Sequence, residues 1–400
     1  MKKESPLMNL YHKDATKTVL ASLISILIGL VLGAVIVFIV SLFNENITVK
    51  AGWEGIQLVL FGMFSKGRDA SGQLAWGFNS TNWGNMLFRA TPLLMTGLSV
   101  AVAYKTGLFN IGAPGQYLMG TAATLLVALS IDTAIVPAWI VWILAFLAGM
   151  VAGARWGAIP GLLKATRGIN EVLACIMTNW IAANIVTMIF SNSALRNGDE
   201  SGKIGYHKPT ARNGVETAKM GRDKRCPNSQ GNGGIIIAIL IAILVYILMT
   251  KTTLGYQLRA CGSNRHAARY AGINDKRNIV LSMAIAGALA GGGAALYWLS
   301  GNTEFFWSTY QSLPDAGFNG IPVALLAANN PIGVIFTAMF MSLLDICGLQ
   351  LKTFTAYNEY ITDIIISAIV YLSAFSLVIK LWLGERSKKK KAKDTGKEEA

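Results

Sequence analysis

Long apolar segments alternate with shorter polar ones along this 400-residue chain. Most of the apolar segments approach the roughly 20 residues that an α-helix needs to cross a bilayer. The pattern predicts membrane-spanning helices at residues 18–43, 86–103, 114–131, 134–154, 171–190, 235–250, 279–300, 317–328, 331–349 and 361–383. The eighth of these is short, and Asn329-Asn330-Pro331 after it predicts a turn between two parts of a broken helix. We therefore expect an all-α, polytopic bundle of about ten transmembrane helices.

Composition supports a membrane protein. Hydrophobic residues make up 53% of the chain and charged residues only 14%, with a mean hydropathy of +0.47, whereas a soluble domain is about 25% charged. The first apolar segment is too long for the core of a signal peptide, so we interpret it as a retained helix. The net charge of +14 does not predict nucleic-acid binding, because the basic residues form no single patch. The four cysteines show neither metal-ligand nor disulfide spacing.

Charge bias orients the predicted helices. Cytoplasmic segments of membrane proteins are enriched in lysine and arginine, which places the N-terminus (1–17) and the basic tail (384–400) inside. We predict that this tail is disordered. Ten crossings satisfy both ends, with a transmembrane domain at 18–383 and a cytoplasmic loop at 251–278. The loop at 191–234 is then external, although it is itself rich in lysine and arginine.

One polar break falls where a helix would otherwise continue. Residues 103–119 contain three glycines and a proline around Asn110 and Gln116. Free backbone groups at membrane depth are tolerated only against protein or a watery cavity, and broken helices often form transporter substrate sites. A tight cytoplasmic turn, with glycines used for packing, explains the same residues equally well.

Two further segments carry polar groups into apolar surroundings. Glu171 opens the fifth predicted helix, where a carboxylate suits either capping or gating, and Asn179 lies close to the same helical face two turns later. Gly317-Phe318-Asn319-Gly320-Ile321 is similar to Gly107-Leu108-Phe109-Asn110-Ile111-Gly112, either as a trace of an internal repeat or by chance. Asn110, Gln116, Asn179 and Asn319 are the candidates for a polar pathway.

The segment 254–273 predicts a docking surface. It is polar, carries three arginines between two apolar helices, and contains small residues that would give a short helix a smooth face before a turn at Gly272. No phosphate-binding loop, zinc-binding helix or nucleophile elbow is present. We therefore assign no catalytic residue and no metal ligand.

Together these segments resemble the permease subunits of bacterial ABC importers of the simple-sugar and nucleoside family, and most closely the larger permease of guanosine-type importers. The resemblance rests on 107–116, 168–172 with 177–179, 258–273, and 317–331, in that order along the chain. It implies a bacterial cell-membrane protein that works as a heterodimer with a second permease, a cytoplasmic ABC ATPase and a substrate-binding lipoprotein. It also implies nucleoside as substrate and no cofactor of the chain's own, since ATP would be bound by the partner.

In this resemblance, the cytoplasmic loop is the coupling helix that fits the ATPase. The residues assigned to coupling are Arg259, Asn264, His266, Ala267, Ala268 and Gly272. His266 stands where the family has an acidic residue, and Pro114 stands where an acidic residue precedes Gly-Gln. A permease for ribose or galactose is the nearest alternative. An ion-coupled secondary carrier and a membrane scaffold are more distant ones, because few carboxylates are buried and the polar breaks suit transport.

Overall fold

The computed structural model is mostly helical and divides into two compact units. It describes residues 14–43, 48–191, 195, 207–208, 210, 214–219, 229–309, 311–358 and 360–373. Residues 80–343 form the larger unit, and residues 1–79 with 344–400 form the smaller one. The predicted tail 384–400 and most of the predicted N-terminal segment 1–17 lie outside the described residues.

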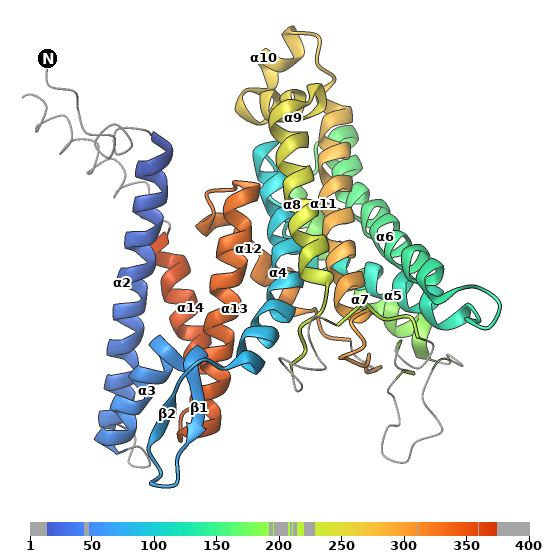
Figure 1. The fold of residues 1–400 in the computed structure, drawn as a ribbon. Helices are drawn as coiled ribbons and strands as arrows, with labels where there is room; N and C mark the ends of the chain where they lie inside the picture. The colour runs from blue at the N-terminus through green and yellow to red at the C-terminus, as the bar shows by residue number, and fades with distance from the viewer. Residues whose placement is uncertain are drawn as a thin grey trace, which may run out of the picture. The chain divides into compact units, whose positions relative to one another are not determined.

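The larger unit is built from helices (Figure 1). In chain order these are α4 (Ser80–Lys105), α5 (Ala113–Ser130), α6 (Ala138–Arg167), α7 (Glu171–Ser191), α8 (Gly234–Lys251), α9 (Thr253–Ser263), α10 (Arg265–Tyr270), α11 (Asp275–Trp298), α12 (Asp315–Leu326) and the first part of α13 (Pro331–Phe354). Within the described residues, α4, α6, α7, α8, α11 and α13 are long and apolar enough to cross a membrane. The predicted multi-pass helical architecture is confirmed, but a total of ten crossings is not.

Helix α11 forms the centre of this unit and packs against α4, α5 and α6. Gly287 and Gly291 of α11 lie directly against Gly153 of α6, so closely that a side chain at any of the three would overlap the backbone of the facing helix. Gly291 also lies against Gly120 of α5. Small residues favour such contacts in membranes because apolar area gives no preference for a neighbouring helix over lipid. The glycines of 287–293 therefore serve helix packing.

The smaller unit contains helices that the apolar pattern predicted, at its two ends, and shorter elements between them that it did not. Its elements are α2 (Asp14–Phe43), α3 (Val49–Phe61), the 3₁₀ turn η1 (Gly62–Phe64), the strands β1 (Ser65–Arg68) and β2 (Leu74–Trp76), the end of α13, and α14 (Tyr360–Ser373). The strands form an antiparallel hairpin, which corrects the purely helical prediction. The hairpin is too short to give an alternating sequence signal. Its turn depends on Gly72, which has φ +77°.

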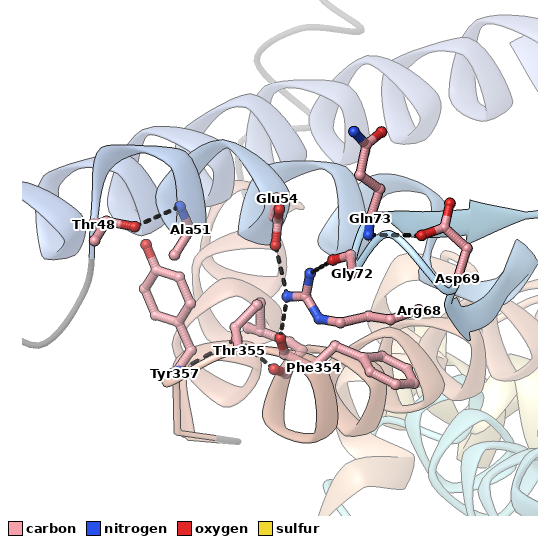
Figure 2. Close-up of polar contacts among 11 residues, drawn as sticks. Thr48, Ala51, Glu54, Arg68, Asp69, Gly72, Gln73, Phe354, Thr355 and Tyr357 are labelled. Atoms are coloured by element: carbon pink, nitrogen blue, oxygen red, sulfur yellow. Dashed lines mark hydrogen bonds and ion pairs between the residues drawn. The ribbon is translucent and has the colours of Figure 1, made fainter.

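Arg68 joins the hairpin to two helices (Figure 2). Its guanidinium forms an ion pair with Glu54 of α3 at 2.7 Å and donates hydrogen bonds to the carbonyl oxygens of Gly72 (2.6 Å) and Phe354 (2.7 Å). Phe354 is the last residue of α13, whose final carbonyl groups have no partner within the helix. One side chain thus holds α3, the hairpin turn and the end of α13 together.

The turn of the hairpin is also held by Asp69. Its carboxylate accepts hydrogen bonds from the hydroxyl of Ser71 (2.6 Å) and from the backbone N–H groups of Ser71 and Gln73, both at 2.9 Å. The bond from the Ser71 hydroxyl, followed by the backbone bond from Gln73, lowers the pKa of Asp69 below its usual value. The turn therefore keeps its acceptor charged at neutral pH.

Helices α2 and α14 run antiparallel inside the smaller unit. Gly29 of α2 lies against Ile369, and Gly33, one turn later, lies against Ile365, one turn earlier. At the far end of α2 the hydroxyl of Tyr357, just before α14, donates a 2.8 Å hydrogen bond to the carbonyl oxygen of Val37. Helix α2 contributes the apolar stretch Leu27–Phe43 to this packing, and α14 contributes Tyr360–Ile369.

Candidate functional site

The helical run of the larger unit breaks at residues 106–112, between α4 and α5. Gly107 adopts φ +74°, and the N–H of Leu108 donates to the carbonyl oxygen of Ala103 at 3.0 Å. A Cβ on Gly107 would lie 3.2 Å from the Cα of Gly262 in α9, and a Cβ on Gly262 would overlap the carbonyl oxygen of Lys105. The break and α9 are therefore in direct backbone contact.

Two predicted pathway residues form a reciprocal amide pair at this break. The Nδ2 of Asn110 donates to the Oε1 of Gln116 at 2.8 Å, and the Nε2 of Gln116 donates back to the Oδ1 of Asn110 at 3.0 Å. Asn110 also donates to the hydroxyl of Ser99 (3.0 Å) and accepts from the N–H of Gly112 (3.1 Å). Both side chains are buried, with exposed fractions of 0% and 1%.

Asn179 of α7 joins the same group. Its Oδ1 accepts from the N–H of Gly115 at 2.9 Å, and its Nδ2 donates to the carbonyl oxygen of Ile111 at 3.0 Å. The first N–H groups of a helix have no partner within the helix, so Asn179 caps α5 from outside. The structure thus brings Asn110, Gln116 and Asn179 together at the break. In this conformation their amides brace the break with hydrogen bonds inside the chain.

Asn319 is placed apart from this group, on the exposed face of α12. The glycines around it explain why. A Cβ on Gly317 would lie 2.5 Å from the Cα of Pro114, in the first turn of α5, and one on Gly320 would lie 2.6 Å from the backbone of Thr96. Both glycines therefore face inward and Asn319 faces away. A role in the pathway remains a prediction for all four residues.

Glu171 forms an ion pair with Lys164. Lys164 lies in the last turn of α6 and Glu171 in the first turn of α7, so each charge also suits the dipole of its own helix. Both side chains are largely buried. The pair fixes the α6–α7 turn, which fits the capping interpretation of Glu171.

The segment 252–274, which we call the coupling segment, lies at one end of α8 and α11 (Figure 1). A side chain of this segment caps the start of each of the helices α9, α10 and α11. The side chain of Thr252 accepts from Gly255 N–H (3.1 Å), that of Asn264 from Ala267 N–H (3.0 Å), and that of Asn274 from Arg277 N–H (3.0 Å). Side-chain caps of this kind stabilise a helix start by about 1 kcal/mol. Gly272, with φ +79°, ends the turn after α10.

The residues assigned to coupling divide into inward and outward positions. Ala268 is buried, and Arg259 donates to a carbonyl oxygen one turn earlier in α9. His266 and Ala267 are exposed. Tyr270, which no sequence pattern indicated as functional, is 95% exposed at the end of α10. A large exposed aromatic side chain beside small ones is typical of a binding anchor.

A second residue missed by sequence reasoning stabilises this segment. The guanidinium of Arg269 forms an ion pair with the carboxylate of Asp275 at 2.7 Å, and it joins α10 to the start of α11. Asp275 is nearly buried whereas Arg269 is largely exposed. The six-residue spacing between them in the sequence gives no helical signal, because a turn intervenes.

Comparison with known proteins identifies the family to which the chain belongs. Residues 82–374 match a family described as "Branched-chain amino acid transport system / permease component". This range is most of the chain. The chain belongs to this permease family.

This permease is similar to individual transport proteins over most of its length. It is 34% identical to the guanosine ABC transporter permease protein NupP of Bacillus subtilis, over 92% of this chain and 97% of that protein. It is 35% identical to the nucleoside ABC transporter permease protein NupB of Lactococcus lactis, over 92% and 94%. The glucose ABC transporter permease protein TsgB13 of Haloferax volcanii is 30% identical, over 71% and 74%. The permease is thus a component of an ABC transport system.

Alanine substitutions at Asn110 and at Asn319 distinguish a residue that stabilises the helix break from a residue that would contact the substrate. Asn110→Ala leaves Gln116 without its buried partner, which costs about 1–3 kcal/mol. We therefore expect a lower unfolding temperature of the purified permease. Asn319→Ala removes an exposed side chain, and we expect an unchanged unfolding temperature with weaker substrate-dependent transport. Equal thermal stability of Asn110→Ala and the natural protein would contradict the bracing role.

Proposed function

We propose that this chain is a membrane-spanning subunit of an ATP-driven importer of nucleosides. The observation that carries the proposal is the coverage of its nucleoside and guanosine relatives, which reaches 92% of the chain at 34–35% identity. The glucose permease matches at 30% over 71%, so a simple sugar is the second candidate substrate. An ion-coupled carrier has no comparable support.

The arrangement of charges supports a cytoplasmic position for the coupling segment. Lys105 ends α4 beside Gly262 of this segment, and Lys251 ends α8 directly before it. The segment itself carries Arg265 and Arg269. Lysine and arginine near helix ends are enriched on the cytoplasmic side.

The other end of α11 is covered by parts of the long loop. The N–H of Thr217 donates to the carbonyl oxygen of Leu299 at 2.7 Å. The hydroxyl of Thr210 donates to the carbonyl oxygen of Trp298 at 3.0 Å. Since α11 leads away from the coupling segment, these contacts support an external position for the loop predicted at 191–234. Its lysines and arginines are then an exception to the enrichment of these residues on the cytoplasmic side.

Ten crossings follow if α12 counts as a short one. Its 12 residues span about 18 Å, less than the roughly 30 Å hydrocarbon core. The chain turns after it through Ala328 and Asn329, both with positive φ, and α13 returns antiparallel to α4, with Val334 near Gly97. Both termini are then cytoplasmic, in a bacterial cell membrane. With α12 as a short crossing, Asn319 would lie within the membrane, where a neutral polar ligand would pass.

The proposed mechanism is alternating access. A separate cytoplasmic ATPase binds ATP, closes, and moves the coupling segment. The contact between Gly262 and Gly107 carries this movement to the break that Asn110, Gln116 and Asn179 brace. Amide groups offer donors and acceptors without charge, which suits the neutral sugar and base of a nucleoside. The chain would need no cofactor of its own.

The other partners follow from the same proposal. A second permease would complete the pathway opposite α12, whose exposed face carries Asn319. A lipoprotein would deliver the nucleoside at the external end. The ABC transporter permeases that match support a multi-component system, and the arrangement of its subunits is our inference.

Uptake measurements test the substrate. In cells that carry the complete transporter, removal of this chain is expected to abolish uptake of radiolabelled guanosine and uridine and to leave ribose uptake unchanged. Unlabelled nucleosides would serve as competitors, and re-expression of the chain would serve as the control. Loss of ribose uptake alone would overturn the nucleoside proposal in favour of the sugar.

Removal of the exposed aromatic side chain tests the docking surface. Tyr270→Ala leaves the capping bonds of Thr252, Asn264 and Asn274 in place, so the permease should keep its unfolding temperature. We expect the ATPase subunit to co-purify several-fold less with this variant. Tyr246→Ala, at a partly exposed tyrosine of α8 outside the coupling segment, is the matched control. Unchanged co-purification of the Tyr270 variant would remove Tyr270 from the interface.

A further inference from the structure

The smaller unit contains an apolar pocket of about 460 Å³, within the roughly 300–1,000 Å³ range of small-molecule sites. Helix α3 supplies most of its wall, and η1 and β2 supply one aromatic residue each. The lining residues are Trp53, Ile56, Gln57, Leu60, Phe61, Phe64 and Trp76. Gln57 is the one polar residue among them. Such a lining favours a hydrocarbon ligand over a hydrogen-bonding one.

The pocket exists because α3 presents two different faces. On one face of α3, the backbone at Gly52 and Gly55 packs directly against the side chains of Ser41 and Tyr357, which leaves no space there. Trp53, on the other face, is 61% exposed. The ion pair between Glu54 and Arg68 then fixes the hairpin beside α3. The pocket is therefore a built feature of the fold.

The position of the pocket along the chain points to the membrane surface. Helix α3 has 13 residues, or about 20 Å, too short to cross the hydrocarbon core. It directly follows α2, whose apolar part ends at Phe43. An amphipathic helix of this kind lies in the interface, and tryptophans such as Trp53 and Trp76 are enriched at that depth.

A positive charge adjoins the pocket. Lys66 of β1 follows Phe64 by two residues, and Ser65 before it pairs with Trp76 across the hairpin. The Nζ of Lys66 would lie 2.9 Å from a Cβ added at Gly77, the residue after Trp76. The Lys66 side chain is exposed. A lysine at the rim of an apolar pocket suits a ligand with an anionic head and a hydrocarbon tail.

We propose that this pocket binds one acyl chain of an anionic phospholipid, whose headgroup contacts Lys66. The lipid belongs to the leaflet at the C-terminal end of α2. By filling the space between α3 and β2, it would hold the hairpin against α3 together with Arg68. The proposal depends on the membrane location of the chain and is independent of the transported substrate.

Lipid binding by the full chain in its purified transporter tests this site. After delipidation, the complex would be titrated with phosphatidylglycerol or phosphatidylcholine, and bound lipid would be counted by native mass spectrometry. Leu60→Trp fills the pocket, and we expect several-fold less bound phosphatidylglycerol. Leu240→Trp, at an exposed leucine of α8 outside the pocket, is the matched control and should retain the lipid. Equal retention by both variants would overturn the proposal.

The charge at the rim is tested separately, with a variant that leaves the pocket lining intact. Lys66→Gln should bind phosphatidylglycerol several-fold less tightly and phosphatidylcholine unchanged, because only the anionic headgroup loses its partner. A photo-crosslinker in place of Phe61, activated in membranes, should attach to lipid. Attachment to the second permease, to another copy of the chain or to the binding protein would assign the pocket to a protein interface and contradict the proposal.

Discussion

The backbone contact between Gly107 and Gly262 is the constraint on which the functional part of this structure depends. It joins the polar break at 106–112, between α4 and α5, to α9, the first helix of the coupling segment. Backbone atoms in direct contact transmit displacement with little loss, because no flexible side chain lies between them. Any movement imposed on α9 must therefore shift residues 106–112, or separate the two elements.

A shift of the break would disturb the hydrogen bonds of the side-chain amides around it. Asn110, Gln116 and Asn179 hold one another and the start of α5 through buried hydrogen bonds. Such a network is rigid when it is fully satisfied and costly when it is partly broken. A shift that opens the network releases amide groups able to bind a neutral polar ligand. In the mechanism that we propose, the same residues brace one conformation and serve the pathway in another.

Sequence alone predicted the six described helices that are long and apolar enough to cross a membrane, because burial in lipid demands long apolar runs that are visible without any partner. The coupling segment was also visible, since its polar residues interrupt such runs. The sequence could not show that Asn110 and Gln116 bond to each other, because amides that bind ligands and amides that bind neighbours have the same composition. The Arg269–Asp275 pair, the exposed Tyr270 and the 65–76 hairpin depend on turn geometry, for which short polar segments give little signal.

The coupling ratio of the reconstituted transporter tests the central claim most directly. In Gly262→Ala, the added methyl group would overlap the carbonyl oxygen of Lys105 and push α9 away from the break. With Ser263→Ala as the neighbouring control, the measurement is the number of nucleoside molecules imported per ATP hydrolysed. The account predicts that Gly262→Ala retains ATP hydrolysis while this ratio falls several-fold. An unchanged ratio would show that the contact does not transmit the movement.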